Sequence, residues 1–126
     1  MYNFEKLTVW QKTMDFCELI YKETRKFPKE EMFGLVSQLR RAAVSVALNI
    51  SEGSACCSKR EFARFLNIAL CSQYEVATII RLGKKLGFLT SETYLEVSSS
   101  LEEIGRLLHG LINSLTTDNR QPTTNV

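Results

Sequence analysis

The chain has 126 residues, 44% of them hydrophobic, and its 16 Lys and Arg against 14 Asp and Glu give a formal net charge of +2. This length predicts a single domain that buries a core without disulfides or structural metals. The near balance of charge argues against a strong polyanion binder. No apolar run reaches membrane-spanning length, and the N-terminus lacks the pattern of a secretion signal. The sequence therefore predicts a cytoplasmic protein with no membrane partner.

The cysteines predict neither a disulfide framework nor a zinc site, because no two of them are spaced as Cys-x-x-Cys. Cys17 and Cys71 fall within helical patterns, and we expect both to be buried thiols. Cys56 and Cys57 fall in a predicted loop, where exposure would make them sensitive to oxidation.

Capping residues, glycines and prolines divide the chain into four predicted helices. Two of the starts fit the capping box, in which a side-chain hydroxyl and a Glu or Gln three residues later satisfy each other's backbone amides. The predicted starts are, in chain order, Thr8 with Gln11, Glu30 and Glu31 after Pro28, Ser58 with Glu61, and Thr90 between Leu89 and Tyr94.

Apolar residues recur at alternating steps of three and four, which is the spacing of a bundle seam. No strand pattern competes with it. The predicted seams are Trp10, Met14, Cys17 and Tyr21 in the first helix; Phe62, Leu66, Ala69, Val76 and Ile80 in the third; and Tyr94, Val97, Leu101, Ile104, Leu108, Leu111 and Leu115 in the last.

Short connections make successive helices antiparallel neighbours, so the predicted fold is an all-α, up-and-down four-helix bundle over residues 1–115. Residues 116–126 lack apolar periodicity, and we expect them to form a disordered tail. Further apolar residues lie off the seams and are expected to serve an oligomer: Phe16, Ile20, Phe65, Ile79, Leu107 and Ile112.

One stripe of the helix predicted over residues 38–53 carries only polar side chains, and two of these are short and neutral. The stripe is either the solvated side of an amphipathic helix or a satisfied polar network at a helix or subunit interface. Its members are Gln38, Arg41, Ser45, Asn49 and Glu52.

Basic residues concentrate on the third predicted helix, in a row that contains no carboxylate. Arg64 and Arg81 are separated by roughly 25 Å along a helix, so the two ends of the row would contact separate phosphates of RNA or DNA. The alternative is an ordinary solvated face. The row is Arg60, Arg64, Asn67, Cys71, Tyr74, Thr78, Arg81 and Lys85, and the candidate nucleic-acid-binding residues are Arg60, Arg64, Arg81, Lys84 and Lys85.

No pattern predicts an enzyme. The single histidine is His109, and Arg106 stands where a Glu-x-x-His di-iron helix needs its carboxylate. The chain has no phosphate-binding loop and no nucleophile elbow. We therefore predict no catalytic residue, no metal ligand and no cofactor.

A set of motifs spread over residues 4–115 resembles the bacterial four-helix-bundle family encoded in intervening sequences of large-subunit ribosomal RNA genes. These motifs are Phe4 to Leu7, Val9-Trp10-Gln11-Lys12, Phe27-Pro28, Phe33-Gly34-Leu35, Gln38-Leu39-Arg40-Arg41-Ala42-Ala43, Ser45, Asn49-Ile50-Ser51-Glu52-Gly53, Glu61-Phe62, Phe65-Leu66, Ile68-Ala69, Ser72, Glu75, Leu86-Gly87-Phe88-Leu89 and Gly110-Leu111-Ile112.

The resemblance implies a homopentamer without enzyme activity and a role linked to RNA. A related group comprises accessory variability proteins of diversity-generating retroelements, which implies nucleic acid and a reverse transcriptase as partners. The alternative is a protein-interaction scaffold that binds no nucleic acid. In the light of the family, Ser72 and Glu75 are expected to join the polar stripe, and Glu52 to pair with Arg41 or a backbone amide.

Overall fold

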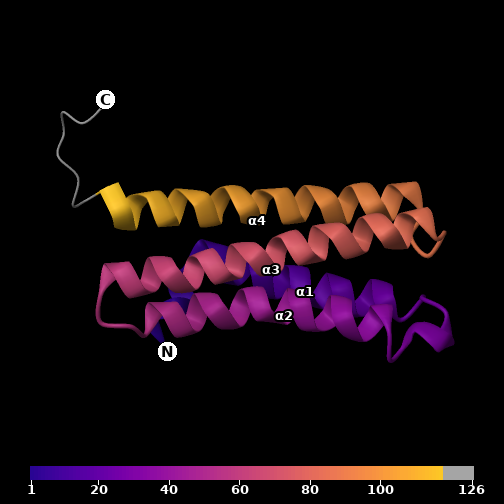
Figure 1. Cartoon of the computed structure of the whole chain (residues 1–126), viewed down its shortest axis with the longest axis horizontal. Helices are drawn as coiled ribbons and strands as arrows, with labels where there is room; N and C mark the ends of the chain where they lie inside the picture. Colours follow the sequence, from indigo (N-terminus) through magenta and orange to yellow (C-terminus); the bar gives the residue numbers. More distant parts are fainter. Residues whose placement is uncertain (118–126) are drawn as a thin grey trace.

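Four long helices lie side by side in the computed structural model, which describes residues 1–117 (Figure 1). They are α1 (Thr8–Thr24), α2 (Leu35–Ser54), α3 (Lys59–Lys85) and α4 (Ser91–Thr117), with the short 3-10 helices η1 (Asn3–Lys6) and η2 (Lys29–Glu31). Each long helix reverses direction relative to the one before it. The predicted all-α four-helix bundle is confirmed.

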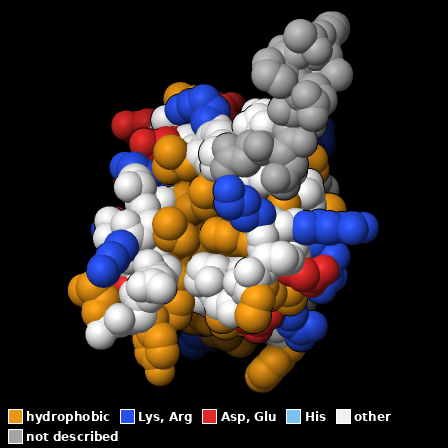
Figure 2. Space-filling view, turned by 90° about the vertical axis from the view of Figure 1, so that its left-hand side faces the viewer, with side chains coloured by type: hydrophobic (Ala, Val, Ile, Leu, Met, Phe, Trp, Pro, Cys, Tyr) orange, Lys and Arg blue, Asp and Glu red, His pale blue; other side chains and the backbone are white. Residues whose placement is uncertain are grey.

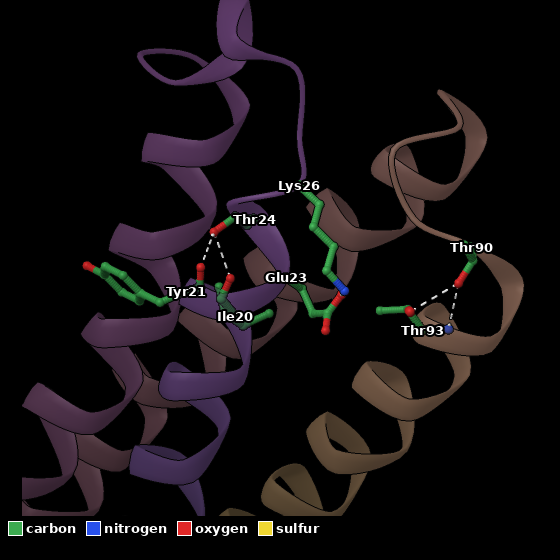
Figure 3. A network of polar contacts seen from close by, with 7 residues as sticks. All are labelled: Ile20, Tyr21, Glu23, Thr24, Lys26, Thr90 and Thr93. Carbon is green, nitrogen blue, oxygen red and sulfur yellow. Dashed lines mark hydrogen bonds and ion pairs between the residues drawn. The ribbon is translucent and has the colours of Figure 1, made fainter.

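The α1–α2 and α3–α4 turns lie at one end of the bundle, shown closely in Figure 3. There the Thr24 hydroxyl donates to the Ile20 carbonyl at 2.7 Å, and Arg40 Nε donates to the Thr24 hydroxyl at 2.9 Å. Because Arg40 lies on α2, its bond to Thr24 ties the end of α1 to the neighbouring helix.

The α3–α4 turn depends on Gly87, whose φ is +82°. In this left-handed conformation the Gly87 amide donates to Lys84 O at 3.0 Å, and the Phe88 amide donates to Gly83 O at 2.9 Å. These bonds satisfy the last carbonyls of α3, and a side chain at Gly87 would strain the backbone. The Phe88 ring then lies 5.4 Å from the Phe27 ring, which joins the two turns at this end.

The seams predicted for α3 and α4 lie in the core. From α3, Leu66, Ala69, Val76 and Ile80 are buried, while Phe62 is half-buried. From α4, the residues from Val97 to Leu108 on the seam are buried, and Tyr94, Leu111 and Leu115 pack against the core from its margin.

The seam predicted for α1 is wrong, because the helix is rotated about its axis so that a neighbouring face lies in the core. Of its residues only Cys17 is buried, whereas Met14 and Tyr21 are 44% and 40% exposed. The buried face instead includes Thr13, which is fully buried because its hydroxyl donates to the Val9 carbonyl at 2.7 Å. Tyr21 packs under the Arg40 guanidinium, 4.4 Å from its ring centre. The full set of buried α1 residues is Val9, Thr13, Phe16, Cys17, Ile20, Glu23 and Thr24.

Five of the six apolar residues assigned to an oligomer are used within the chain itself, and the sixth, Phe65, is half-buried outside the core cluster. Phe16, Ile20 and Ile79 are buried in the core, and Leu107 and Ile112 pack against it. Other apolar side chains are exposed instead: Met14, Tyr21, Met32, Phe33, Leu48, Ile68, Tyr74, Leu82, Leu86 and Leu95, besides Met1 and Tyr2.

Two of the predicted helix starts are correct and two are displaced. The Ser58 hydroxyl accepts from the Glu61 amide at 3.1 Å, and the Thr90 hydroxyl accepts from the Thr93 amide at 3.1 Å. Thr8 is instead the first residue of α1, because Gln11 donates to Glu5 O in η1 at 2.8 Å and not to a cap.

The acidic pair after Pro28 forms η2, and α2 begins only at Leu35, whose amide donates to Glu31 Oε1 at 3.2 Å. At the other end of the chain, Thr116 and Thr117 still belong to α4, so the predicted tail begins too early. The rest of that prediction, residues 118–126, lies outside the described residues. No helix in residues 1–117 combines the length and the apolar character needed to cross a membrane.

Candidate functional site

The candidate basic residues of α3 are all exposed, but they form two groups and not one continuous row. Arg60 and Arg64 lie near the α2–α3 turn, and Arg81, Lys84 and Lys85 lie near the α3–α4 turn. Figure 2 faces the first of these ends and shows Lys and Arg side chains scattered around it among hydrophobic and neutral ones. A single strongly basic patch is therefore absent from this view.

The group near the α2–α3 turn is partly neutralised. Arg64 Nε lies 3.0 Å from Glu61 Oε1, one helical turn away, and the guanidinium also covers the Phe65 ring at 4.7 Å. Although the row itself contains no carboxylate, Arg64 is therefore not free of an acidic partner. Glu61 stands beside the row because it completes the N-terminal turn that Ser58 caps.

The group near the α3–α4 turn keeps its charge free. Within residues 1–117, none of the three side chains of Arg81, Lys84 and Lys85 forms an ion pair. Lys84 Nζ lies 4.7 Å from the centre of the Tyr94 ring on α4. Lysines in the last turn also complement the helix dipole, which stabilises α3 by a few tenths of a kcal/mol. We define Arg81, Lys84 and Lys85 as the basic cluster.

Two hollows adjoin the basic cluster. A shallow one of about 320 Å³ lies along α3 and includes Arg81 and Lys85. A second, of about 370 Å³, is the groove between α3 and α4, and Arg81 lines it as well. The groove is lined by Gln73, Tyr74, Ala77, Ile80 and Arg81 of α3 and by Tyr94, Leu95, Ser98, Leu101 and Glu102 of α4.

The structure brings three members of the predicted polar stripe together between α2 and α3. Ser45 Oγ lies 2.9 Å from Ser72 Oγ, and Asn49 Nδ2 donates to Ser45 O at 2.8 Å and to Ser45 Oγ at 3.2 Å. All three side chains are half-buried. These bonds satisfy short polar groups where α2 and α3 approach closely, which is a structural role.

The remaining stripe residues lie apart from this network. Gln38, Arg41, Glu52 and Glu75 are exposed. Glu52 and Arg41 do not pair in the part of the chain that the structure describes, and no backbone amide there donates to the Glu52 carboxylate. The predicted Glu52 pairing is wrong because both side chains extend into solvent.

Sequence reasoning missed a second polar contact, between α3 and α4. Gln73 is only 7% exposed, and its Nε2 donates to Leu101 O at 3.1 Å. Its Oε1 is buried without a hydrogen-bond partner among the described residues. Gly105 makes room for this amide, since a Cβ there would lie 2.6 Å from Gln73 Nε2. A glycine inside a strongly periodic helix was the available signal.

The cysteines divide differently from the prediction. Cys17 is buried, its thiol donates to Ala43 O at 3.3 Å, and burial raises the pKa of that thiol to about 11. Cys71 is exposed on α3, so its predicted burial is wrong. Cys56 is half-buried and Cys57 exposed. Within residues 1–117, no group of three His, Cys, Asp or Glu side chains is arranged to hold a metal ion.

Comparisons with known proteins agree on the family. A family model described as "23S rRNA-intervening sequence protein" matches residues 5–110. A crystal structure from Bacteroides thetaiotaomicron, described as a protein with unknown function from the S23 ribosomal protein family, is 28% identical, with a TM-score of 0.75. That match covers 83% of this chain and 98% of the other. No match was found among curated proteins.

Proposed function

The chain belongs to the 23S rRNA-intervening sequence protein family, and we propose that it is a non-enzymatic bundle that self-associates and binds nucleic acid through the basic cluster of α3. The observation that carries the proposal is the free charge of Arg81, Lys84 and Lys85 in a chain whose overall charge is nearly balanced. Cations without acidic partners are available to phosphates.

One copy of the cluster gives weak binding. Three phosphate contacts predict a slope of about −2.7 in a plot of log K against log salt, which is a loss of roughly 40-fold between about 50 and 200 mM salt. Arg60 adds a further exposed cation at the other end of α3.

A homopentamer, which we propose as the assembly, would place several clusters on one nucleic acid. The local concentration of binding sites then rises, and the salt slope steepens with each protomer that engages. In this form the protein would act in the cytoplasm as an accessory factor, with a reverse transcriptase of a diversity-generating retroelement as a proposed partner.

The test is fluorescence anisotropy with labelled duplex DNA and a structured RNA at several salt concentrations. The triple variant Arg81→Ala, Lys84→Ala, Lys85→Ala is expected to bind at least tenfold more weakly, on the order of half a kcal/mol per lost phosphate contact. Equal binding by the variant and the parent would refute the assignment of the cluster.

The matched control removes the same charge elsewhere, at the exposed residues Lys6, Arg41 and Arg106, none of which lies in the two turns at the end that carries the basic cluster. Substituting all three by Ala should change affinity less than about threefold, because only long-range charge is lost. A control as weak as the cluster variant would mean that net charge, and not this site, decides binding.

A protein-interaction scaffold is the second candidate, favoured by the apolar side chains left exposed. Phe33 is 97% exposed at the turn before α2, and Leu95 is 66% exposed on α4. Large exposed apolar side chains often mark a protein contact. An apolar contact would survive added salt, whereas phosphate binding would collapse.

A further inference from the structure

We infer that the groove between α3 and α4 holds an unpaired nucleobase, an inference that rests on the proposed binding of nucleic acid. The groove is about 370 Å³ in volume and adjoins the basic cluster through their shared residue Arg81. Its shape, its charges and one buried polar group each favour a base as the occupant.

The walls of the groove offer a stacking surface. Tyr74 on α3 is 60% exposed and Leu95 on α4 is 66% exposed, whereas the lining residues Ile80 and Leu101 are buried. Buried apolar residues therefore form the floor, and an aromatic and an aliphatic side chain stand at the rims. A flat base fits between such rims, and stacking on an aromatic ring is how proteins hold single strands without sequence preference.

The charges orient a nucleotide in the groove. Arg81 also lines the neighbouring hollow with Lys85, so a backbone phosphate has cations just outside the groove. Glu102 lines the groove itself, on α4, and would repel a phosphate that entered. This arrangement favours phosphates outside along α3 and the base turned inward.

The floor holds a hydrogen-bond acceptor that no described residue uses. Gln73 lines the groove and is more than nine-tenths buried, yet its Oε1 has no partner. Buried carbonyls without a donor are uncommon in proteins. Rotation of the amide toward the groove, which would give up the Nε2 bond to Leu101 O, would let Oε1 accept from the N–H edge of a base.

A paired base cannot enter the groove, because its faces are stacked and its edge is occupied within the duplex. The inference therefore predicts a preference for single-stranded over duplex nucleic acid. It also predicts that Tyr74 contributes to binding of the single strand alone.

The experiment measures anisotropy of a fluorescein-labelled oligothymidylate and of a labelled duplex, using the full chain at one low salt concentration. Tyr74→Ala is expected to weaken single-strand binding about tenfold and to leave duplex binding unchanged. Tyr74→Phe keeps the ring and should bind like the parent. Phe33→Ala removes another exposed aromatic side chain, one that does not line the groove, and should also bind like the parent.

Several results would overturn the inference while leaving the proposed function intact. These are tighter binding of the parent to duplex, an unchanged single-strand affinity in Tyr74→Ala, or an equal loss for both probes. Binding of neither probe by the parent would instead refute the proposed function and the inference with it. Circular dichroism melts of each variant establish that a loss of binding is not a loss of folding.

Discussion

Gly53, in the last turn of α2, provides the sharpest test of how α2 and α3 pack. A Cβ at this position would lie 2.7 Å from Phe65 Cβ, 3.0 Å from Phe62 Cδ1 and 3.3 Å from Phe62 O. Phe65 Cβ is attached directly to the backbone of α3, so it cannot rotate away. The substitution Gly53→Ala therefore forces the two helices apart at this point.

The magnitude follows from two opposing terms. Overpacking a tight contact lowers the free energy of unfolding by about 1–3 kcal/mol, and we expect a value in the upper half of this range because the backbone must move. Replacing glycine by alanine in a helix raises the free energy of unfolding by up to about 1 kcal/mol, because alanine favours the helix. The net loss is then about 2 kcal/mol, which for a domain of this length lowers Tm by roughly 8 °C.

Gly110 on α4 is the matched control, because a Cβ there would meet no atom within 4 Å. Gly110→Ala should raise stability by about 0.5–1 kcal/mol through helix propensity alone. Both variants are melted by circular dichroism at the same protein concentration. A Gly53→Ala variant that melts at or above the parent would refute the close approach of α2 and α3.

Further predictions concern single groups in the bundle. Asn49→Ala should cost only about 0.5–1 kcal/mol in a thermal melt, because Ser45 Oγ keeps its bond to Ser72; a loss well above 2 kcal/mol would contradict the half-buried network. Ser58→Ala should cost about 1 kcal/mol by removing the α3 cap, and an unchanged Tm would contradict that role. The Cys17 thiol, with its pKa raised by burial to about 11 from an ordinary 9.0, ionises more readily in the unfolded chain. Its contribution to stability is therefore complete below about pH 8 and falls by about 1 kcal/mol between pH 8 and 10; denaturant titrations of Cys17→Ala should show a flatter profile, and identical slopes would exclude this linkage.

The parts of the fold that sequence predicted well are those where independent signals coincide. In α3 and α4 the apolar period agrees with the hydroxyl caps at Ser58 and Thr90, so both seams and both starts are right. In α1 the period fits more than one rotation of the helix. Thr13 decides between these rotations. Its hydroxyl donates to its own helix backbone, so this polar side chain can be buried, and a hydropathy scale does not take that hydrogen bond into account.

The site was less predictable because it depends on distances between helices. The sequence placed Arg64 in a row without carboxylates, yet its partner Glu61 lies one turn away on the same helix. Gln73 was missed because burial of its amide requires Gly105 on the facing helix. Ser45 and Ser72 were expected in one network, and they lie within hydrogen-bond distance because small side chains let α2 and α3 approach.

We propose that copies of this bundle assemble and present the basic cluster to nucleic acid. The most direct measurement is the solution mass by light scattering, followed on the same sample by titration with labelled nucleic acid across a salt series. We expect a pentamer whose binding weakens steeply with salt, with a slope steeper than the roughly −2.7 of a single cluster. A monomer, or an assembly that binds no nucleic acid even at low salt, would contradict it.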